Sequence, residues 1–167
     1  MIKTIGLIMI LACSMLSGML YVSRLKERVR LLRSVYSALH SMECRLSVAM
    51  PELAELFEQC CDKRAAPIAR MIAEGISSGR TAAESIRAAF ASPYVVRLLT
   101  CDEREYLANM LSEVGECSAD GAKGMLIAAE SYTAERISEA DEYEKQNKKA
   151  AMAIAVYAGA AAVIVLM

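Results

Sequence analysis

IGLIMILACSMLSGMLYV, the sequence of residues 5–22, contains eighteen residues and no charged side chain. An α-helix rises about 1.5 Å per residue and the apolar core of a bilayer is about 30 Å thick, so about 20 apolar residues cross it. The stretch is also rich in Ile, Leu and Met. Its length and composition predict a transmembrane helix over residues 5–22.

A second uncharged stretch occupies residues 150–167. It also contains eighteen residues, but eight of them are alanine, and Val163–Met167 supply most of its apolar character. Hydrophobic residues make up 56% of the chain, above the roughly 45–50% that is usual in soluble globular proteins, and the two stretches account for the excess. We therefore predict a second transmembrane helix over residues 150–167, with a weaker apolar signal than the first.

Basic residues flank both stretches on the side of the central region. Lys and Arg close to a membrane-spanning helix tend to stay in the cytoplasm. We therefore expect residues 23–149 to form a cytoplasmic domain, both chain ends to lie outside, and the basic side chains to meet anionic lipid headgroups. The flanking residues are Arg24, Lys26, Arg28, Arg30 and Arg33 after the first stretch, and Lys145, Lys148 and Lys149 before the second.

The central region has the apolar period of helices. Shorter amphipathic stretches at 53–61 and 67–76 follow a long one at 25–46, and no stretch alternates for long enough to indicate a strand. We predict an all-α helical bundle of about six helices, flanked by an N-terminal and a C-terminal transmembrane helix. The inner positions expected on the long stretch are Leu25, Val29, Leu32, Tyr36, Leu39, Met42 and Leu46.

Two capping boxes mark helix starts. In each, a threonine oxygen accepts a hydrogen bond from the amide three residues later, and a glutamate at that position reaches back to the threonine amide. Thr81 with Glu84 predicts a helix from Ala82 to about Ala91, closed by Ser92-Pro93, and Thr100 with Glu103 predicts the next. Glycines then loosen residues 115–124, so we expect a long last helix to begin at Met125 and to run into the second span.

No set of residues provides an enzyme active site. His40 is the only histidine, and we expect it on a partly exposed helix face with no acidic partner at a diagnostic spacing. The stretch Gly75–Thr81 has the glycines of a phosphate-binding loop but lacks the lysine and a preceding strand. The six cysteines have no paired spacing, so we expect reduced thiols. We expect no catalysis, no metal and no cofactor.

The candidate partner contacts are acidic side chains and one exposed turn. Residues 102–144 contain twelve carboxylates against three basic side chains, which is typical of a solvated surface or, alternatively, of an acidic docking face. Trp is absent and Phe occurs twice, so we expect no nucleic-acid partner. Small residues four apart in both end stretches allow helices to pack closely, which permits self-association. The residues that we select as a partner surface are Gly79, Arg80, Glu135, Glu139 and Glu142.

Taken in order along the chain, these motifs resemble the stage III sporulation protein AB family of endospore-forming bacteria. The resemblance covers essentially the whole length. Its motifs are Met1-Ile2-Lys3 with Gly6; Arg24-Leu25-x-x-Arg28 and Leu39-x-x-Met42-Glu43; Pro51-Glu52; Ser78-Gly79-x-Thr81-Ala82-x-Glu84; Ala158-Gly159; and Val163–Met167. The stretch from Gly79 to Phe90 with Pro93 is also similar to the helical cytoplasmic module of the type II secretion F-family platform proteins.

The resemblance implies a membrane scaffold protein of the secretion-like channel complex between mother cell and forespore. Its helical domain would lie on the mother-cell side, in the outer forespore membrane, and would dock an ATPase of the same sporulation group. The alternative is a stand-alone membrane-anchored regulatory or anionic-lipid-binding module. The segment 115–124 departs from the family, which usually has a polar segment there, so no family role is carried over to it.

Overall fold

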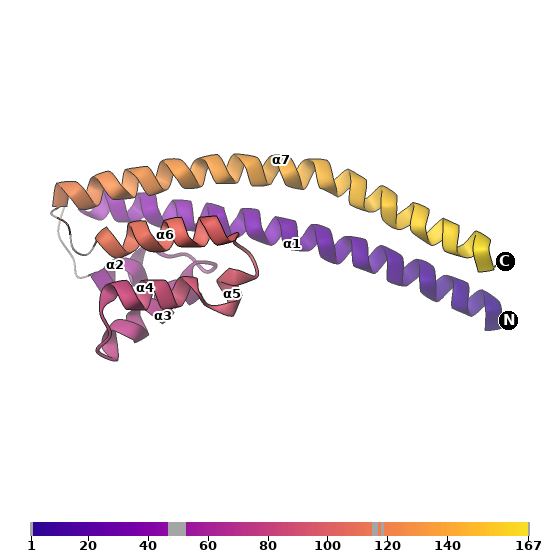
Figure 1. Ribbon diagram of the computed structural model, residues 1–167, viewed down its shortest axis with the longest axis horizontal. Helices are drawn as coiled ribbons and strands as arrows, with labels where there is room; N and C mark the ends of the chain where they lie inside the picture. Colours follow the sequence, from indigo (N-terminus) through magenta and orange to yellow (C-terminus); the bar gives the residue numbers. More distant parts are fainter. Residues whose placement is uncertain (1, 47–52, 115–116, 118, 167) are drawn as a thin grey trace. The chain divides into compact units, whose positions relative to one another are not determined.

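The computed structural model describes residues 2–46, 53–114, 117 and 119–166, and within these ranges it is helical with no strand (Figure 1). The all-α prediction is therefore confirmed. The helices are α1 (Ile2–Leu46), α2 (Leu53–Cys60), α3 (Ala66–Ser77), α4 (Ala82–Phe90), α5 (Pro93–Val96), α6 (Cys101–Val114) and α7 (Ala119–Leu166).

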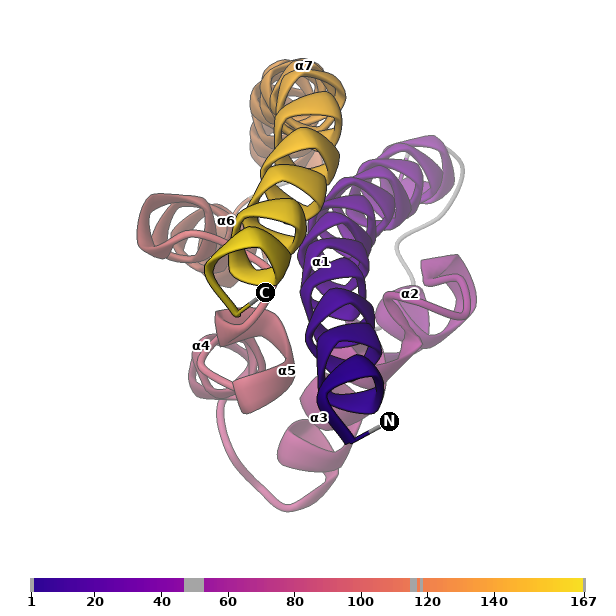
Figure 2. The ribbon, with the colours of Figure 1, turned by 90° about the vertical axis from the view of Figure 1, so that its right-hand side faces the viewer.

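The helices divide into two compact units. The terminal unit contains Met1–Val29 and Ser138–Met167, and the central unit contains Arg30–Ile137, so α1 and α7 each contribute to both. In the terminal unit the two helices run side by side in opposite directions (Figures 1 and 2). Its buried apolar side chains, among those described, are Val22, Val29 and Ala140.

The structure gives no support to the predicted membrane spans. Within the described residues, no helix combines the length and the apolar character that crossing a bilayer requires. Much of 5–22 and of 150–167 lies outside the residues whose side chains the structure describes. The two spans therefore remain predictions.

The central unit has its own apolar core. In it, α3 packs between α2 and α4, and α4 packs on α6, with the short α5 joining the last two. Burial of apolar side chains from every long helix supplies the main driving force for such a fold. The side chains with almost no exposure are Leu31, Leu32, Leu39, Leu56, Ile72, Ile86, Leu107 and Leu126.

The buried face of α1 is wider than the sequence period predicts. Val29, Leu32, Leu39 and Met42 are buried as expected, whereas Tyr36 is 37% exposed. The additional buried positions are Leu31, Ser34, Val35 and Ala38. Helix faces that meet more than one neighbour carry a broad apolar stripe, and α1 contacts both the α2–α3 region and α7. The choice of Tyr36 as an inner residue was therefore wrong.

Two element boundaries also differ from the prediction. Pro93–Val96 forms the short helix α5 with proline in its first turn, where the sequence indicates only a break. Helix α7 begins at Ala119 and not at Met125, so Gly124 lies inside it. Ala122 and Leu126 are buried, and this packing outweighs the low helix propensity of glycine. Of the predicted loose segment, Gly115, Glu116 and Ser118 lie outside the described residues.

Candidate interaction surfaces

The turn between α3 and α4 is built from glycine and two caps. Gly79 has φ +86°, a left-handed conformation that glycine adopts without strain. The Gly79 amide donates to the Ile76 carbonyl (3.0 Å) and the Arg80 amide to the Gly75 carbonyl (3.2 Å), which is the Schellman pattern of a helix end. These bonds fix the direction in which the chain leaves α3.

The capping box at Thr81 then starts α4. The Glu84 amide donates to Oγ1 of Thr81 (3.2 Å), and the Thr81 amide donates to Oε2 of Glu84 (3.1 Å). Because α3 ends and α4 begins with satisfied backbone groups, Gly79 and Arg80 are held at an exposed and well-defined turn. For these two predicted partner residues, the structure therefore gives a defined local geometry.

A cavity of about 260 Å³ lies beside this turn. Its lining combines apolar side chains with the charged groups of Glu74 and Arg80, and Met71 at its edge is 40% exposed. The α3 and α4 backbones come close at Gly75, where an added Cβ would lie 2.5 Å from Oγ of Ser85. An apolar patch with a polar rim is the usual make-up of a protein-binding surface. The sequence did not single out Met71, because only the packing of α3 on α4 creates the cavity.

The second capping box has a different environment. The Thr100 amide donates to Oε2 of Glu103 (2.8 Å), and the Glu103 amide lies 3.4 Å from Oγ1 of Thr100. Glu103 is only 1% exposed. A buried carboxylate must have hydrogen-bond partners to be tolerated, so this residue serves the fold and does not offer a partner surface.

The predicted acidic contact residues divide between the two units. Glu135 belongs to the central unit and is exposed, while Glu139 and Glu142 belong to the terminal unit and are exposed there. Figures 1 and 2 both place the α3–α4 turn on the side of the central unit away from α7. The turn and Glu135 are therefore separate candidate surfaces.

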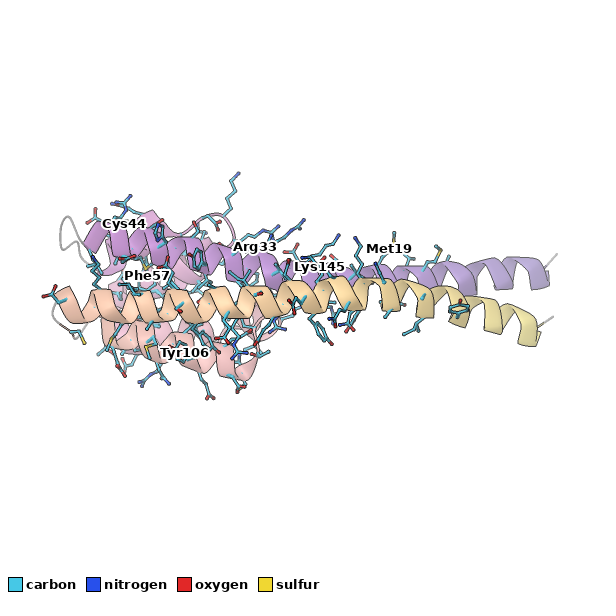
Figure 3. The ribbon with its side chains drawn as sticks, turned by 90° about the horizontal axis from the view of Figure 1, so that it is seen from above. Met19, Arg33, Cys44, Phe57, Tyr106 and Lys145 are labelled. Atoms are coloured by element: carbon cyan, nitrogen blue, oxygen red, sulfur yellow. The ribbon has the colours of Figure 1, made fainter. Side chains whose placement is uncertain are left out.

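The predicted membrane-flanking basic residues divide between the units. Arg30 and Arg33 belong to the central unit, where both are exposed. In the terminal unit, Nζ of Lys145, which Figure 3 labels, lies 2.9 Å from Oδ2 of Asp141, one helical turn earlier on α7. The remaining basic residues of the terminal unit are Arg24, Lys26 and Arg28 on α1 and Lys148 and Lys149 on α7. Both helices thus bring positive charge to the same unit.

His40 lies on an exposed helix face, with its side chain 60% exposed, and it has two acidic neighbours that we did not predict. Its Nδ1 is 2.8 Å from Oε1 of Glu130 and 3.9 Å from Oε2 of Glu43. Nζ of Lys123 lies 3.8 Å from Oε1 of Glu43. The i,i+3 spacing of His40 and Glu43 was a readable signal. The contact with Glu130 cannot be read from the sequence, because only the packing of α7 against α1 brings this residue to His40.

A second groove, of about 210 Å³, lies between α4 and α6. Arg87, Phe90 and Arg104 are among its lining residues. Nε of Arg104 is buried there without a hydrogen-bond partner among the described residues. This basic groove was also missed, because its two arginines are seventeen positions apart and only the α4–α6 packing joins them.

All six cysteines are free thiols. Burial, with smaller contributions from Cys60 and Asp62, raises the pKa of Cys61 to about 12. Burial also raises the pKa of Cys60. Since the thiolate is the reactive form, the adjacent pair Cys60–Cys61 is suited to packing and not to redox or metal chemistry.

The comparisons with known proteins give one positive finding. The family model of stage III sporulation protein AB matches residues 3–167. No curated protein and no solved structure matches the chain. The similarity to type II secretion F-family platform proteins therefore stays a prediction. The family match covers nearly the whole sequence and agrees with the motifs that run from its first residues to its last: the chain belongs to the stage III sporulation protein AB family.

Proposed function

We propose that this protein is a membrane-attached, non-enzymatic assembly component of the channel complex between mother cell and forespore, and that its central unit docks an ATPase of that complex. Membership of the family implies a role in sporulation. Membrane attachment, a place in the channel complex and docking of the ATPase are what we propose beyond that role. The observation that carries it is the exposed apolar surface of the terminal unit beside its basic residues.

The exposed apolar side chains of the terminal unit argue for contact with lipid. Soluble monomers rarely expose a continuous apolar patch of this kind. The described ones are Met9, Met15, Leu16, Met19, Leu20, Tyr21, Tyr143, Ile154 and Tyr157, all at least 45% exposed. Met19 and Lys145 in Figure 3 mark the apolar and basic parts of this unit. Uncharged helices ending in Lys and Arg are the usual pattern of membrane anchors whose basic ends stay in the cytoplasm.

Cysteine labelling tests the topology. In spheroplasts that express the chain, we expect a membrane-impermeant maleimide to label cysteines introduced as Ile2→Cys and Met167→Cys in a background without Cys13. The exposed native residues Cys44 and Cys101 should react only after permeabilisation and serve as the internal control. Labelling of residue 2 or 167 only after permeabilisation would contradict the two-span arrangement and favour helices that lie on the membrane surface.

The cavity at the α3–α4 turn is the proposed ATPase contact. It joins an exposed methionine, Met71, to the guanidinium of Arg80, and a partner helix with an acidic and an apolar side chain would complement both. In nanodiscs that contain the full chain, Arg80→Glu and Met71→Ser should each weaken ATPase binding about tenfold or more. Arg97→Glu makes the same charge change at an exposed position outside the cavity and should leave binding unchanged.

The stand-alone lipid-binding module is the second candidate function. The basic residues of the terminal unit favour it, since each Lys or Arg near an anionic surface adds roughly 1 kcal/mol of attraction. It predicts no ATPase binding in any nanodisc and loss of function when the basic residues are neutralised. ATPase binding that survives in zwitterionic lipid and is lost in Arg80→Glu would instead support the scaffold.

A further inference from the structure

A mixed nitrogen and oxygen cluster joins the first and last helices of the central unit. His40 and Glu43 lie one turn apart on α1, and Glu130 comes from α7. One ligand atom from each, Nδ1 of His40 and one carboxylate oxygen from each glutamate, lies within 4.8 Å of the other two. We propose that these three side chains form a binding site for a divalent transition-metal ion, with Zn²⁺ as the preferred ion.

The distances suit such an ion. Zinc bonds to imidazole nitrogen and carboxylate oxygen are about 2.0–2.2 Å long, so the ligand atoms of a tetrahedral site lie roughly 3.3–3.5 Å apart. The two measured separations from Nδ1 of His40, 2.8 Å to Glu130 and 3.9 Å to Glu43, fall on either side of that value. Small side-chain rotations would bring both separations to that value. One imidazole and two carboxylates leave the remaining positions to water, as in open zinc sites.

Glu130 is the residue that most needs a partner. Its side chain is 13% exposed, and its Oε1 is buried with no hydrogen-bond partner among the described residues, although Nδ1 of His40 is only 2.8 Å away. When Nδ1 carries no hydrogen, its lone pair faces a buried carboxylate oxygen, and this contact is costly unless a cation binds both atoms. A metal ion coordinated by both atoms supplies that charge without requiring hydrogen-bond alignment.

The other ring nitrogen has a suitable neighbour as well. Nε2 of His40 lies 4.0 Å from Sγ of Cys44, one helical turn further along α1. In the tautomer with its hydrogen on Nε2, His40 donates weakly to this sulfur and presents the lone pair of Nδ1 to the two carboxylates. Metal-binding histidines commonly donate a hydrogen bond from the second nitrogen, usually to an oxygen, which fixes the tautomer; here a sulfur lies in that position.

A substitution of Lys123 distinguishes metal binding from simple ion pairing. Its ammonium approaches Oε1 of Glu43, whereas His40 approaches the other oxygen, Oε2. The ammonium therefore orients this carboxylate and also repels an incoming cation. Lys123→Met should therefore tighten Zn²⁺ binding by roughly two- to fivefold, the effect expected for a partly exposed charge pair. If the cluster were only an ion-pair network, the same change would not produce a metal site.

The experiment is a calorimetric titration of ZnCl₂ into the full chain in detergent. The exposed cysteines Cys13, Cys101 and Cys117 are replaced by serine so that thiols away from the cluster cannot bind the metal, and Cys44 is kept because its sulfur faces Nε2 of His40. We expect one Zn²⁺ per chain, and a melting temperature that rises with Zn²⁺ concentration. MgCl₂ and CaCl₂ should not compete, because imidazole favours transition metals.

Variants of the cluster decide the assignment. Glu130→Gln and His40→Gln should each weaken Zn²⁺ binding by more than the roughly 10–100-fold that loss of an outer-shell partner costs. Glu135→Gln, an exposed carboxylate on the same helix, should leave it unchanged. Binding of equal strength in Glu130→Gln, or no stoichiometric binding in the parent chain, would overturn the site. If the parent chain binds no Zn²⁺ and His40→Gln lowers the melting temperature, the cluster is an ion pair alone.

Discussion

Gly75 is the residue at which α3 and α4 approach most closely. A Cβ placed on it would meet Oγ of Ser85 at 2.5 Å and Cβ of Ser85 at 2.8 Å, closer than real side chains come. Both residues are buried, and Oγ of Ser85 donates to the carbonyl of Thr81 at 2.9 Å, which holds it in place. The glycine therefore allows the close packing that also shapes the cavity beside the turn.

Replacing this glycine tests the packing directly. Gly75→Ala should destabilise the protein by about 1–3 kcal/mol, the usual cost of overpacking a core, offset in part by the higher helix propensity of alanine. The measurement is the free energy of unfolding in urea. Gly124→Ala, in α7, has open space around the new methyl group and should stabilise the protein by up to about 1 kcal/mol. Equal effects of the two changes would contradict the close approach.

Asp62 fixes the start of α3 through a single oxygen. Its Oδ1 accepts hydrogen bonds from the hydroxyl of Ser34 and from the amides of Arg64 (3.0 Å) and Ala65 (3.3 Å). Oγ of Ser34 in turn accepts from the Ala65 amide at 3.1 Å, which ties α1 to this turn. The Ser34 hydrogen bond is the largest cause of a pKa for Asp62 below its ordinary value of 3.8.

This lowered pKa gives stability a defined dependence on pH. A carboxylate whose pKa is lower in the folded than in the unfolded chain stabilises the fold above the unfolded pKa, and the gain is lost as pH falls through the folded pKa. Asp62→Asn should therefore lower stability at pH 7, and the difference from wild type should shrink as the pH falls below about 4. Urea unfolding from pH 7 to 2 measures it. A difference that stays constant with pH would exclude the charged carboxylate as its source, and Glu135→Gln is the exposed control.

At the scale of the element, the caps determine where α4 and α6 begin. Each helix starts one residue after a threonine whose side chain and glutamate partner satisfy backbone amides. Thr81→Ala should cost about 1 kcal/mol in the free energy of unfolding, and Thr81→Ser should recover most of it because serine keeps the acceptor oxygen. Unchanged stability in the alanine variant would mean that the cap contributes nothing to α4.

The elements that could be predicted are those whose signals are local. Helices α2, α3, α4 and α6 follow from apolar spacing, proline and capping residues that lie within a few positions of one another. The start of α7 could not be predicted, because burial of Ala122 and Leu126 overrides two nearby glycines, and α5 has only four residues. Tyr36 was misplaced because the sequence period does not reveal how many neighbours α1 has.

The candidate sites were less predictable than the elements, because most of their residues come from segments far apart in the sequence. The turn at Gly79 and Arg80 could be predicted because a glycine and a capping box are local features, while its contact with a partner stays a prediction. Residues brought together by packing were missed, such as Met71 with Ser85 at the cavity and Glu130 with His40 at the polar cluster. The i,i+3 spacing of His40 and Glu43 lies within one helix but was not recognised as a pair, and a single sequence does not specify which residue of α7 faces them.

At the scale of the whole molecule, the core belongs almost entirely to one unit. Among the described residues, every buried apolar side chain except Val22, Val29 and Ala140 lies within Arg30–Ile137. A region of this size can bury enough apolar surface to fold without disulfides. The central unit also contains its own cross-links between helices, including Ser34 to Asp62 and His40 to Glu130.

This distribution predicts that the central unit folds without the two uncharged end stretches. A fragment of residues 23–149 should be soluble without detergent and should unfold in one cooperative transition, because it keeps the whole central core and removes most of the exposed apolar side chains of the terminal unit. Its melting temperature should lie within about 5 °C of that of the central unit in the full chain, since few buried contacts are lost. Circular dichroism at 222 nm during heating measures the transition.

Leu107→Ala is the control variant, at a position 1% exposed in α6. It should lower the melting temperature of the fragment and of the full chain alike, because it leaves the same cavity in the same core. A fragment that is helical but melts without cooperativity would mean that the terminal unit is required for the packing of the core.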